Sequence, residues 1–191
     1  MRDARPMRFL QLLKLAGLTA VLSLLISSPS SAHEVRHVGP QGQYTLVVGW
    51  LDEPAFANEV NGVDIRVLRT SDKAPINTNR GDVVDLDVEV QYLAAENAKA
   101  DVIDSMKLPS KPTITPGTDN RYASWFKPVR PGAYAFRLTG KISDASDPKA
   151  GEVSIDETFV CGKGSKTEHG FVCLEEPVVF PAPGMAKGGS R

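Results

Sequence analysis

The sequence predicts an all-β protein in which one domain folds as a two-layer sandwich. Two observations support this prediction. Short segments in which apolar and polar residues alternate with a period of two recur between residues 44 and 160, and clusters of Gly, Pro and Asp separate them. Only residues 93–107 could hold a helical turn, and the spacing of their apolar residues is poor for a helix. Short alternating strands each have one face to bury, and two packed sheets bury those faces together.

The chain begins with the three parts of a secretion signal. Residues 1–14 carry four basic side chains and one acidic side chain, residues 15–26 form an uncharged run of 12 residues, and small residues surround Ala32. We therefore expect residues 1–32 to be a signal peptide that is cleaved after Ala32. The run is shorter than the about 20 residues that span a bilayer as a helix, so an uncleaved anchor is the less favoured alternative. No later segment is predicted to cross a membrane.

Composition limits the domain count and the partners. The full chain carries 22 basic and 23 acidic side chains. Without residues 1–32, which hold four basic and one acidic, 18 basic and 22 acidic side chains remain, a net charge of −4 over 159 residues. This length suits one domain, residues 33–180, followed by a flexible tail rich in Gly and Pro, residues 181–191. The acidic balance disfavours nucleic acid as a partner, because nucleic-acid binding needs a basic surface.

The motif His-Glu-x-x-His occurs at His33, Glu34 and His37. In zinc proteases this motif lies on a helix, because positions i and i+4 share a face only at 3.6 residues per turn. Here it would begin at the first residue of the mature chain, and Gly39 and Pro40 would end any helix directly after it. We therefore reject the protease interpretation. The sequence also lacks a nucleophile elbow, a phosphate-binding loop and a dinucleotide fingerprint, so we expect no enzymatic activity.

Cleavage after Ala32 would make His33 the first residue of the mature protein. A histidine at that position offers a free α-amine and an imidazole nitrogen from one residue, and nitrogen-rich tetragonal sites of this kind suit Cu(II). His37 and His169, the other two histidines of the chain, are the candidates for a further ligand, and Glu34 is also near in sequence. The alternative is that His33 merely follows the cleavage site and is solvated.

The strands are predicted from their alternation. They are expected at residues 44–50, 63–67, 85–92, 134–142, 152–160 and 176–180. The side chains expected to face the core are Tyr44, Leu46, Val48, Ile65, Val67, Leu86, Val88, Val90, Tyr134, Phe136 and Leu138. Residues 50–56 hold Trp50 and Phe56, which we interpret as aromatic packing at the end of a strand; the alternative is a loop that displays these aromatics to a partner or a glycan.

Three acidic residues, Asp85, Asp87 and Glu89, share the polar face of one predicted strand. Adjacent like charges repel unless they are solvated or paired. A Ca²⁺ site would need oxygen ligands that converge from a loop. We therefore predict a solvated face with basic partners. The candidate partners are Arg66, Arg137 and Lys141.

The two cysteines, Cys161 and Cys173, would lie in an oxidising compartment after export. An even number of cysteines in a secreted protein favours a disulfide, whereas a redox or metal pair is usually closer in sequence, as in Cys-x-x-Cys. We predict a Cys161–Cys173 disulfide.

Residues 126–136 show a proline-glycine turn, Pro131-Gly132, followed by Tyr134 at the start of a strand. This order resembles the corner before strand F of immunoglobulin-like domains, where a tyrosine hydroxyl bonds back to the main chain. The alternative is an ordinary hairpin with a tyrosine in the core. The sequence therefore predicts a single immunoglobulin-like β-sandwich.

A family resemblance follows from these segments. A signal peptide that ends in Ala-His, followed by "EPAFANEVNGVDIRV" (53–67) and "PGAYAFRL" (131–138), resembles small extracytoplasmic copper-handling β-sandwiches of the copper resistance protein C type and YtkA/FixH-like accessory domains. The resemblance covers about residues 33–160, and its motifs have low specificity. It implies a copper role for His33 alone. The methionine-rich Cu(I) loop of those proteins is absent, since the mature chain contains only Met106 and Met185.

Two functional hypotheses remain. The first is a periplasmic or secreted protein that binds Cu(II) at its mature N-terminus and passes it to a membrane copper transporter or another envelope protein. The second is a metal-free interaction module that binds a protein or an envelope polymer. A second histidine or a carboxylate close to His33 in the fold would favour the first.

Overall fold

The structure is a computed structural model, and it describes residues 33–162 and 170–178. The chain divides into two units, Met1–Ser30 and Ser31–Arg191, and everything described below belongs to the second. The predicted signal peptide, the predicted tail and His169 lie outside the described residues.

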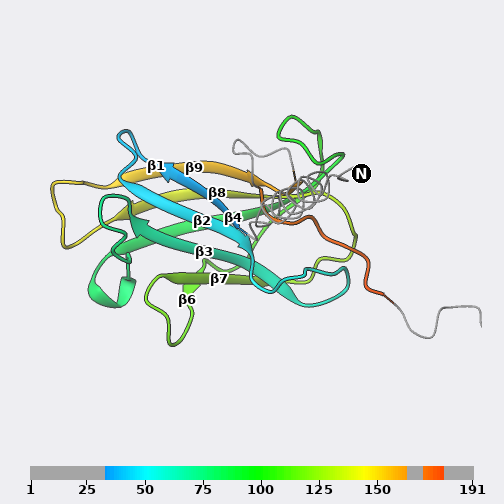
Figure 1. Cartoon of the computed structure of the whole chain (residues 1–191), viewed down its shortest axis with the longest axis horizontal. Helices are drawn as coiled ribbons and strands as arrows, with labels where there is room; N and C mark the ends of the chain where they lie inside the picture. Colours follow the sequence, from blue (N-terminus) through cyan, green and yellow to red (C-terminus); the bar gives the residue numbers. More distant parts are fainter. Residues whose placement is uncertain (1–32, 163–169, 179–191) are drawn as a thin grey trace, which may run out of the picture. The chain divides into compact units, whose positions relative to one another are not determined.

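The described domain is an antiparallel sandwich of two sheets, which lie against each other as layers (Figure 1). The first sheet has the order β1-β2-β3-β7-β6 and the second the order β5-β4-β8-β9. In the first sheet the strands are β1 (His33–Val38), β2 (Tyr44–Trp50), β3 (Asn61–Arg69), β7 (Arg121–Phe126) and β6 (Thr113–Ile114). In the second they are β5 (Val102–Lys107), β4 (Val83–Leu93), β8 (Tyr134–Ser143) and β9 (Val153–Val160). The predicted all-β sandwich is confirmed.

The core lies between the sheets, and every side chain expected to face it is buried there. Its centre is aromatic: the ring of Trp50 packs edge-on against Phe136 at 5.0 Å and against Tyr134 at 5.5 Å between ring centroids. The register therefore follows the alternation in the sequence, because a slip of one residue would turn each of these side chains to the solvent.

Three expectations for secondary structure need correction. The helical turn allowed in residues 93–107 is not formed; β5 occupies the end of that segment, and all six of its residues are exposed. The predicted strand 176–180 is also wrong where it can be seen, since residues 176–178 are not in a strand. The β-bridges of this region lie just before residue 176 in the sequence: Leu174 pairs with Gly132, and Glu175 pairs with Phe56. Alternation did not predict β1, because this strand turns Glu34 and Arg36 inward.

The only helical element in the described residues is a 3₁₀ turn, η1 (Thr78–Arg80). Accordingly, the described part of the chain contains no helix that could cross a membrane.

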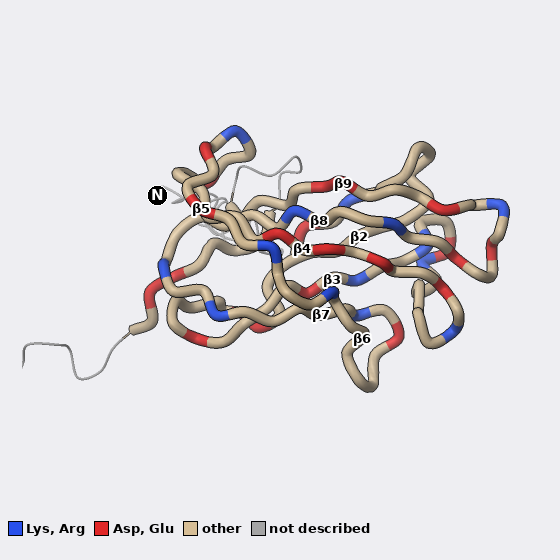
Figure 2. Tube along the Cα trace, turned by 180° about the vertical axis from the view of Figure 1, so that it is seen from behind, with Lys and Arg blue, Asp and Glu red and all other residues tan. Residues whose placement is uncertain are grey.

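The acidic face of β4 is solvated and paired, as predicted (Figure 2). Glu89 lies 3.8 Å from Arg137, and Asp87 lies 3.0 Å from Lys107, while Asp85 pairs with Lys111. Of the expected partners only Arg137 pairs with this face: Arg66 contacts Asp64, and Lys141 contacts Glu152. Exposed ion pairs of this kind contribute little to the stability of the fold, so this face is mainly a charged, solvent-exposed surface.

The tyrosine corner is formed. The hydroxyl of Tyr134 donates a hydrogen bond to the carbonyl oxygen of Arg130 at 2.8 Å. The hydroxyl of Tyr92 donates a hydrogen bond to the carbonyl oxygen of Pro131 at 3.1 Å. Both bonds fix the loop between β7 and β8 against the second sheet.

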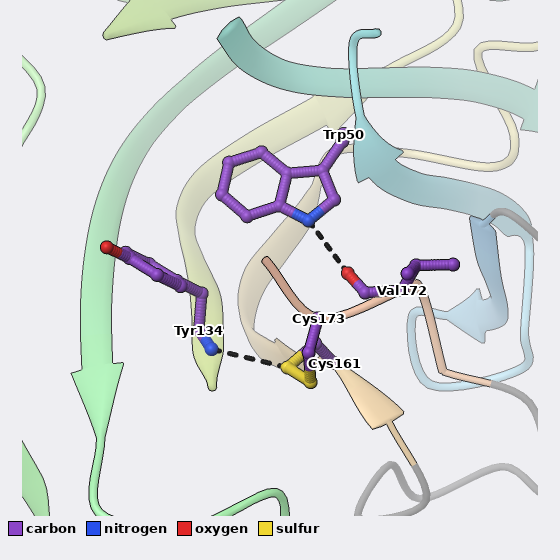
Figure 3. Close-up of a disulfide and its surroundings, with 5 residues drawn as sticks. All are labelled: Trp50, Tyr134, Cys161, Val172 and Cys173. Carbon is purple, nitrogen blue, oxygen red and sulfur yellow. Dashed lines mark hydrogen bonds between the residues drawn. A yellow bond between two sulfur atoms is a disulfide. The ribbon is translucent and has the colours of Figure 1, made fainter. Parts of the chain in front are cut away.

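The disulfide Cys161–Cys173 is also confirmed, with Cα atoms 4.9 Å apart (Figure 3). It fastens residues 170–175 across one end of the core. There the ring of Phe171 stacks on Phe136 at 4.8 Å, and the indole N–H of Trp50 donates to the carbonyl oxygen of Val172 at 2.8 Å. These residues close the end of the sandwich at which β2 ends.

Candidate functional site

The His-Glu-x-x-His residues lie on strand β1, not on a helix. Successive side chains of a strand point to opposite faces, so His33 and His37 lie on the outer face and Glu34 lies between the sheets. Four residues of strand separate the two histidines by about 13 Å at about 3.3 Å per residue. The structure therefore does not bring the side chains of His33 and His37 together at one place.

His33 reaches a buried carboxylate two strands away. Its ring nitrogen Nε2 lies 3.0 Å from Oδ2 of Asp64 on β3, and the Asp64 side chain is fully buried. The register explains this contact: His33 pairs with Gly49 on β2, and Gly49 pairs with Asp64. Because Gly49 has no side chain, the imidazole can lie over β2 and reach Asp64.

Two arginines complete the surroundings of Asp64. Nε of Arg121 lies 3.0 Å from Oδ1, and an Nη atom of Arg66 lies 3.4 Å from Oδ2. Burial by itself would raise the pKa of Asp64, but the hydrogen bonds from His33 and Arg121 and the charges of both arginines outweigh it and lower that pKa below its ordinary value. Asp64 is thus an anion that holds its neighbours in place. With two guanidinium groups beside it, it is poorly suited to be a metal ligand itself.

Glu53, in the loop after β2, is the second carboxyl group near His33. Burial raises the pKa of Glu53, the charge of His33 lowers it, and the charge of Asp64 raises it, with a net rise. Its Oε1 atom is buried and has no hydrogen-bond partner within the described part of the chain. A buried carboxyl oxygen without a partner is costly, and such atoms often mark a functional position.

His37, another predicted metal residue, is not brought to this place. Nδ1 of His37 lies 2.9 Å from the hydroxyl of Thr45, which in turn contacts the hydroxyl of Thr70. His169 lies outside the described residues. No group of three His, Cys, Asp or Glu side chains in residues 33–162 and 170–178 is arranged as a metal cluster.

Sequence reasoning named His33 but missed Asp64 and Glu53. Glu53 lies within residues 50–56, which the sequence predicts to be the aromatic end of a strand, and Asp64 is a polar residue of the predicted strand 63–67. A signal was present in Gly49, a glycine inside a strand pattern, since such a residue often marks a close approach by another group. It could not show which group approaches.

Comparisons of the chain with protein-family models, with curated proteins and with solved structures found no match.

Proposed function

We propose that this protein is an extracytoplasmic, non-enzymatic β-sandwich that binds one Cu(II) ion at His33 after the chain is cut behind Ala32. The bound ion would be passed to a membrane copper transporter or another envelope protein. The observation that carries this proposal is the 3.0 Å contact between Nε2 of His33 and the buried carboxylate of Asp64.

That contact supports the proposal because it orients the imidazole. Histidines that bind metals commonly donate their second ring N–H to a carboxylate, which fixes the tautomer and raises the basicity of the ring. With the Nε2 proton directed to Asp64, Nδ1 is the ring nitrogen that would coordinate. Nδ1 and the α-amine of the same residue close a six-membered chelate, so covalent geometry holds the two nitrogen ligands together.

Glu53 supports the same proposal as a source of oxygen. Its buried Oε1 atom has no hydrogen-bond partner in the described part of the chain, and its pKa responds to the charge of His33. Nitrogen and carboxylate ligands together suit Cu(II). A cation at His33 would stabilise the ionised form of Glu53 that burial disfavours. Glu53 is therefore a carboxylate near His33, which is the kind of residue expected to favour the copper hypothesis.

Export is supported by two independent features. The first 32 residues have the charge and apolar pattern of a signal peptide. In the described part of the chain both cysteines are joined in a disulfide, which is usual for oxidising compartments. The family resemblance, carried by the segments at 53–67 and 131–138, agrees with a copper role in such a compartment.

The test is a titration of Cu(II) into three forms of the mature protein: one beginning at His33, one with a glycine added before His33, and His33→Ala. Only the first should bind tightly, because the added residue converts the α-amine into an amide. Binding should weaken as pH falls, because nitrogen ligands must be free of protons to coordinate a metal ion. Equal affinity in the first two forms would refute the proposal.

Variants of the other candidate ligands extend this test. Glu53→Gln should weaken Cu(II) binding and change its electron paramagnetic resonance spectrum, whereas His37→Ala should change neither. His169→Ala shows whether the segment between the cysteines supplies a further nitrogen. Mass spectrometry of the exported protein establishes separately whether His33 is its first residue.

A further inference from the structure

The two sheets end in four edge strands, which differ in how far they are protected against pairing with another chain. An exposed edge presents main-chain N–H and C=O groups that can accept a further strand, and natural proteins block such edges with inward charges, prolines or short length. Strands β1 and β9 carry inward charges. Arg36 on β1 lies 2.9 Å from Glu157 on β9, and its guanidinium group lies 4.3 Å from the centre of the Phe159 ring.

The edge strand β6 is protected by its length and by prolines. It contains only two residues, Thr113 and Ile114, between Pro112 and Pro116. Proline has no N–H group to donate and limits strand pairing. A partner could therefore add to β6 over only a very short distance.

The edge strand β5 is less protected: the one charged residue on its inner side is Asp104, and that residue is exposed. The strand spans six residues without proline, and all of them are exposed. Three are large and apolar: Val102 is 49% exposed, Ile103 58% and Met106 49%. One side of β5 pairs with β4, and no strand among the described residues pairs with its other side. Six residues give an edge about 20 Å long at about 3.4 Å per residue.

A cleft of about 280 Å³ runs along the inner side of β5, between this strand and the loop that follows β7. Met106 lines the cleft on the side of the strand, and Phe126 and Val129 line it on the other side. Val129 is 59% exposed. A strand that paired with β5 would place every second side chain over this cleft, because side chains alternate between the two faces of a sheet.

The side of the cleft formed by the loop after β7 is basic. Lys127 and Arg130 both line it and are exposed, and in the described part of the chain the side chain of neither forms an ion pair. Asp104 is the acidic residue on the opposite rim. The charge of the loop side therefore favours an acidic group on the occupant.

We propose that β5 and this cleft form a docking surface for a partner protein, which binds by adding an extended segment as a further strand of the second sheet. The segment would alternate apolar residues, which enter the cleft beside Met106 and Val129, with at least one acidic residue that pairs with Lys127 or Arg130. The open main-chain groups of β5 favour a strand over a helix, and the basic loop side of the cleft favours an acidic segment over a basic one. The docking surface does not include His33, Glu53 or Asp64, so binding there does not require a metal.

The test uses the mature protein in the presence of a metal chelator and a displayed library of random ten-residue peptides. The enriched peptides should alternate apolar and polar residues and contain Asp or Glu. Synthetic copies should bind more weakly as salt increases. A selection that yields no peptides, or only basic or proline-rich ones, would overturn the proposal.

Variants locate the binding. Met106→Asp and the pair Lys127→Glu/Arg130→Glu should each weaken binding of the selected peptides at least tenfold. The matched control is the pair Lys73→Glu/Lys149→Glu, because both lysines are exposed and neither forms an ion pair within the described residues. Lys73 follows β3, and Lys149 lines a cleft beside Arg69. Both therefore lie at the end of β3 opposite the docking surface. All variants are expected to keep the thermal unfolding temperature of the parent protein. Equal affinities across parent and docking-surface variants would place the peptide elsewhere.

Two other occupants would contradict the proposal by separate results. If light scattering shows a dimer of the protein alone that Met106→Asp dissociates, a second copy occupies β5. If truncation after Val178 strengthens peptide binding at least tenfold, the protein's own C-terminal residues occupy the cleft.

Discussion

The indole N–H of Trp50 donates a hydrogen bond to the carbonyl oxygen of Val172, 122 positions later in the chain, over 2.8 Å (Figure 3). The bond joins the middle of the core to a segment that belongs to no strand. The Cys161–Cys173 disulfide fastens the same segment, and the main-chain N–H of Tyr134 contacts Sγ of Cys161 at 3.3 Å. One end of the sandwich is therefore closed by residues that depend on a covalent link.

The first prediction concerns this closure. Replacement of both cysteines, Cys161→Ala/Cys173→Ala, should lower the free energy of unfolding by about 2–4 kcal/mol, because the unfolded chain loses its constraint and Phe171 is held less firmly. Urea denaturation measures the loss. Reductant should destabilise the parent protein by a similar amount and leave the double variant unchanged. Two free thiols in the unreduced, denatured protein would show that the disulfide does not form.

The second prediction concerns the buried ion pair at the edge of the sandwich. Nε of Arg36 lies 2.5 Å from Oε1 of Glu34, and both side chains are buried. Arg36→Leu should cost about 3–5 kcal/mol, because it leaves the carboxylate of Glu34 buried without a counter-charge. The double variant Glu34→Leu/Arg36→Leu should be more stable than Arg36→Leu, because it also removes the buried charge of Glu34. Among the described residues, one oxygen of Glu34 and one nitrogen of Arg36 have no hydrogen-bond partner even in the parent protein.

A double-mutant cycle by urea denaturation measures both effects. Glu157→Gln, which changes the partly exposed partner of Arg36, serves as the control and should cost much less. A double variant that is no more stable than the single one would contradict the prediction.

The third prediction is a pH dependence that arises from Asp64. Hydrogen bonds from His33 and Arg121 lower the pKa of this carboxyl group in the folded protein. The stability that ionised Asp64 gives the folded protein is therefore complete above the pKa of this group in the unfolded chain, about 3.9. It is lost as pH falls from there through the lower pKa of the folded protein. Asp64→Asn should unfold more readily at neutral pH and lose less stability on acidification than the parent protein.

Asp144 provides a comparison, because hydrogen bonds from Ser146 and Arg69 also lower its pKa against the effect of burial. In Asp144→Asn the free energy of unfolding should decrease less on acidification than in the parent protein, and His33 should be unaffected. The chemical shifts of the His33 ring nitrogens should change in Asp64→Asn only. If both variants follow the parent profile, neither carboxyl group has a lowered pKa.

The fourth prediction concerns Glu53, whose pKa shift has the opposite sign. Burial raises the pKa of Glu53, so the ionised form is disfavoured in the folded protein, and the cost is present above the unfolded value of about 4.3. Glu53→Gln should therefore unfold at the same or a higher temperature at pH 7 while it weakens Cu(II) binding. A loss of stability at pH 7 would show that the ionised carboxylate stabilises the fold.

The fifth prediction concerns Gly49, over which the imidazole of His33 reaches Asp64. Gly49→Val adds a side chain to the outer face between these two residues and should break their contact. The fold should persist, because valine is well suited to a strand. Nitrogen chemical shifts of the His33 ring report the loss, and Cu(II) affinity should fall with it. Val47→Ile, which enlarges a side chain on the same face of β2, is the matched control.

The sequence alone determined which faces of the long strands are buried. Leu86, Val88 and Val90 alternate with acidic residues, and only one placement of that strand keeps the charges solvated. The pattern failed for β5, because a strand exposed at every position has no buried face to produce alternation. It failed for β1, because Glu34 and Arg36 neutralise each other between the sheets and so occupy positions that otherwise require apolar residues.

The disulfide and the tyrosine corner could also be predicted, since both depend on residues close together in the chain. Cys161 and Cys173 are 12 positions apart, and the hydroxyl of Tyr134 reaches a carbonyl only four positions earlier. Local chain geometry limits where such partners can lie.

The surroundings of His33 were decided only by the tertiary structure. Asp64 is 31 positions away, and it meets His33 because β1 pairs with β2, β2 pairs with β3, and the residue between them is a glycine. The docking surface likewise depends on the sheet order, which leaves β5 at an edge and sets the loop after β7 opposite it. Alternation along one strand shows which face a side chain takes, but strand order and register determine which other side chains share that face.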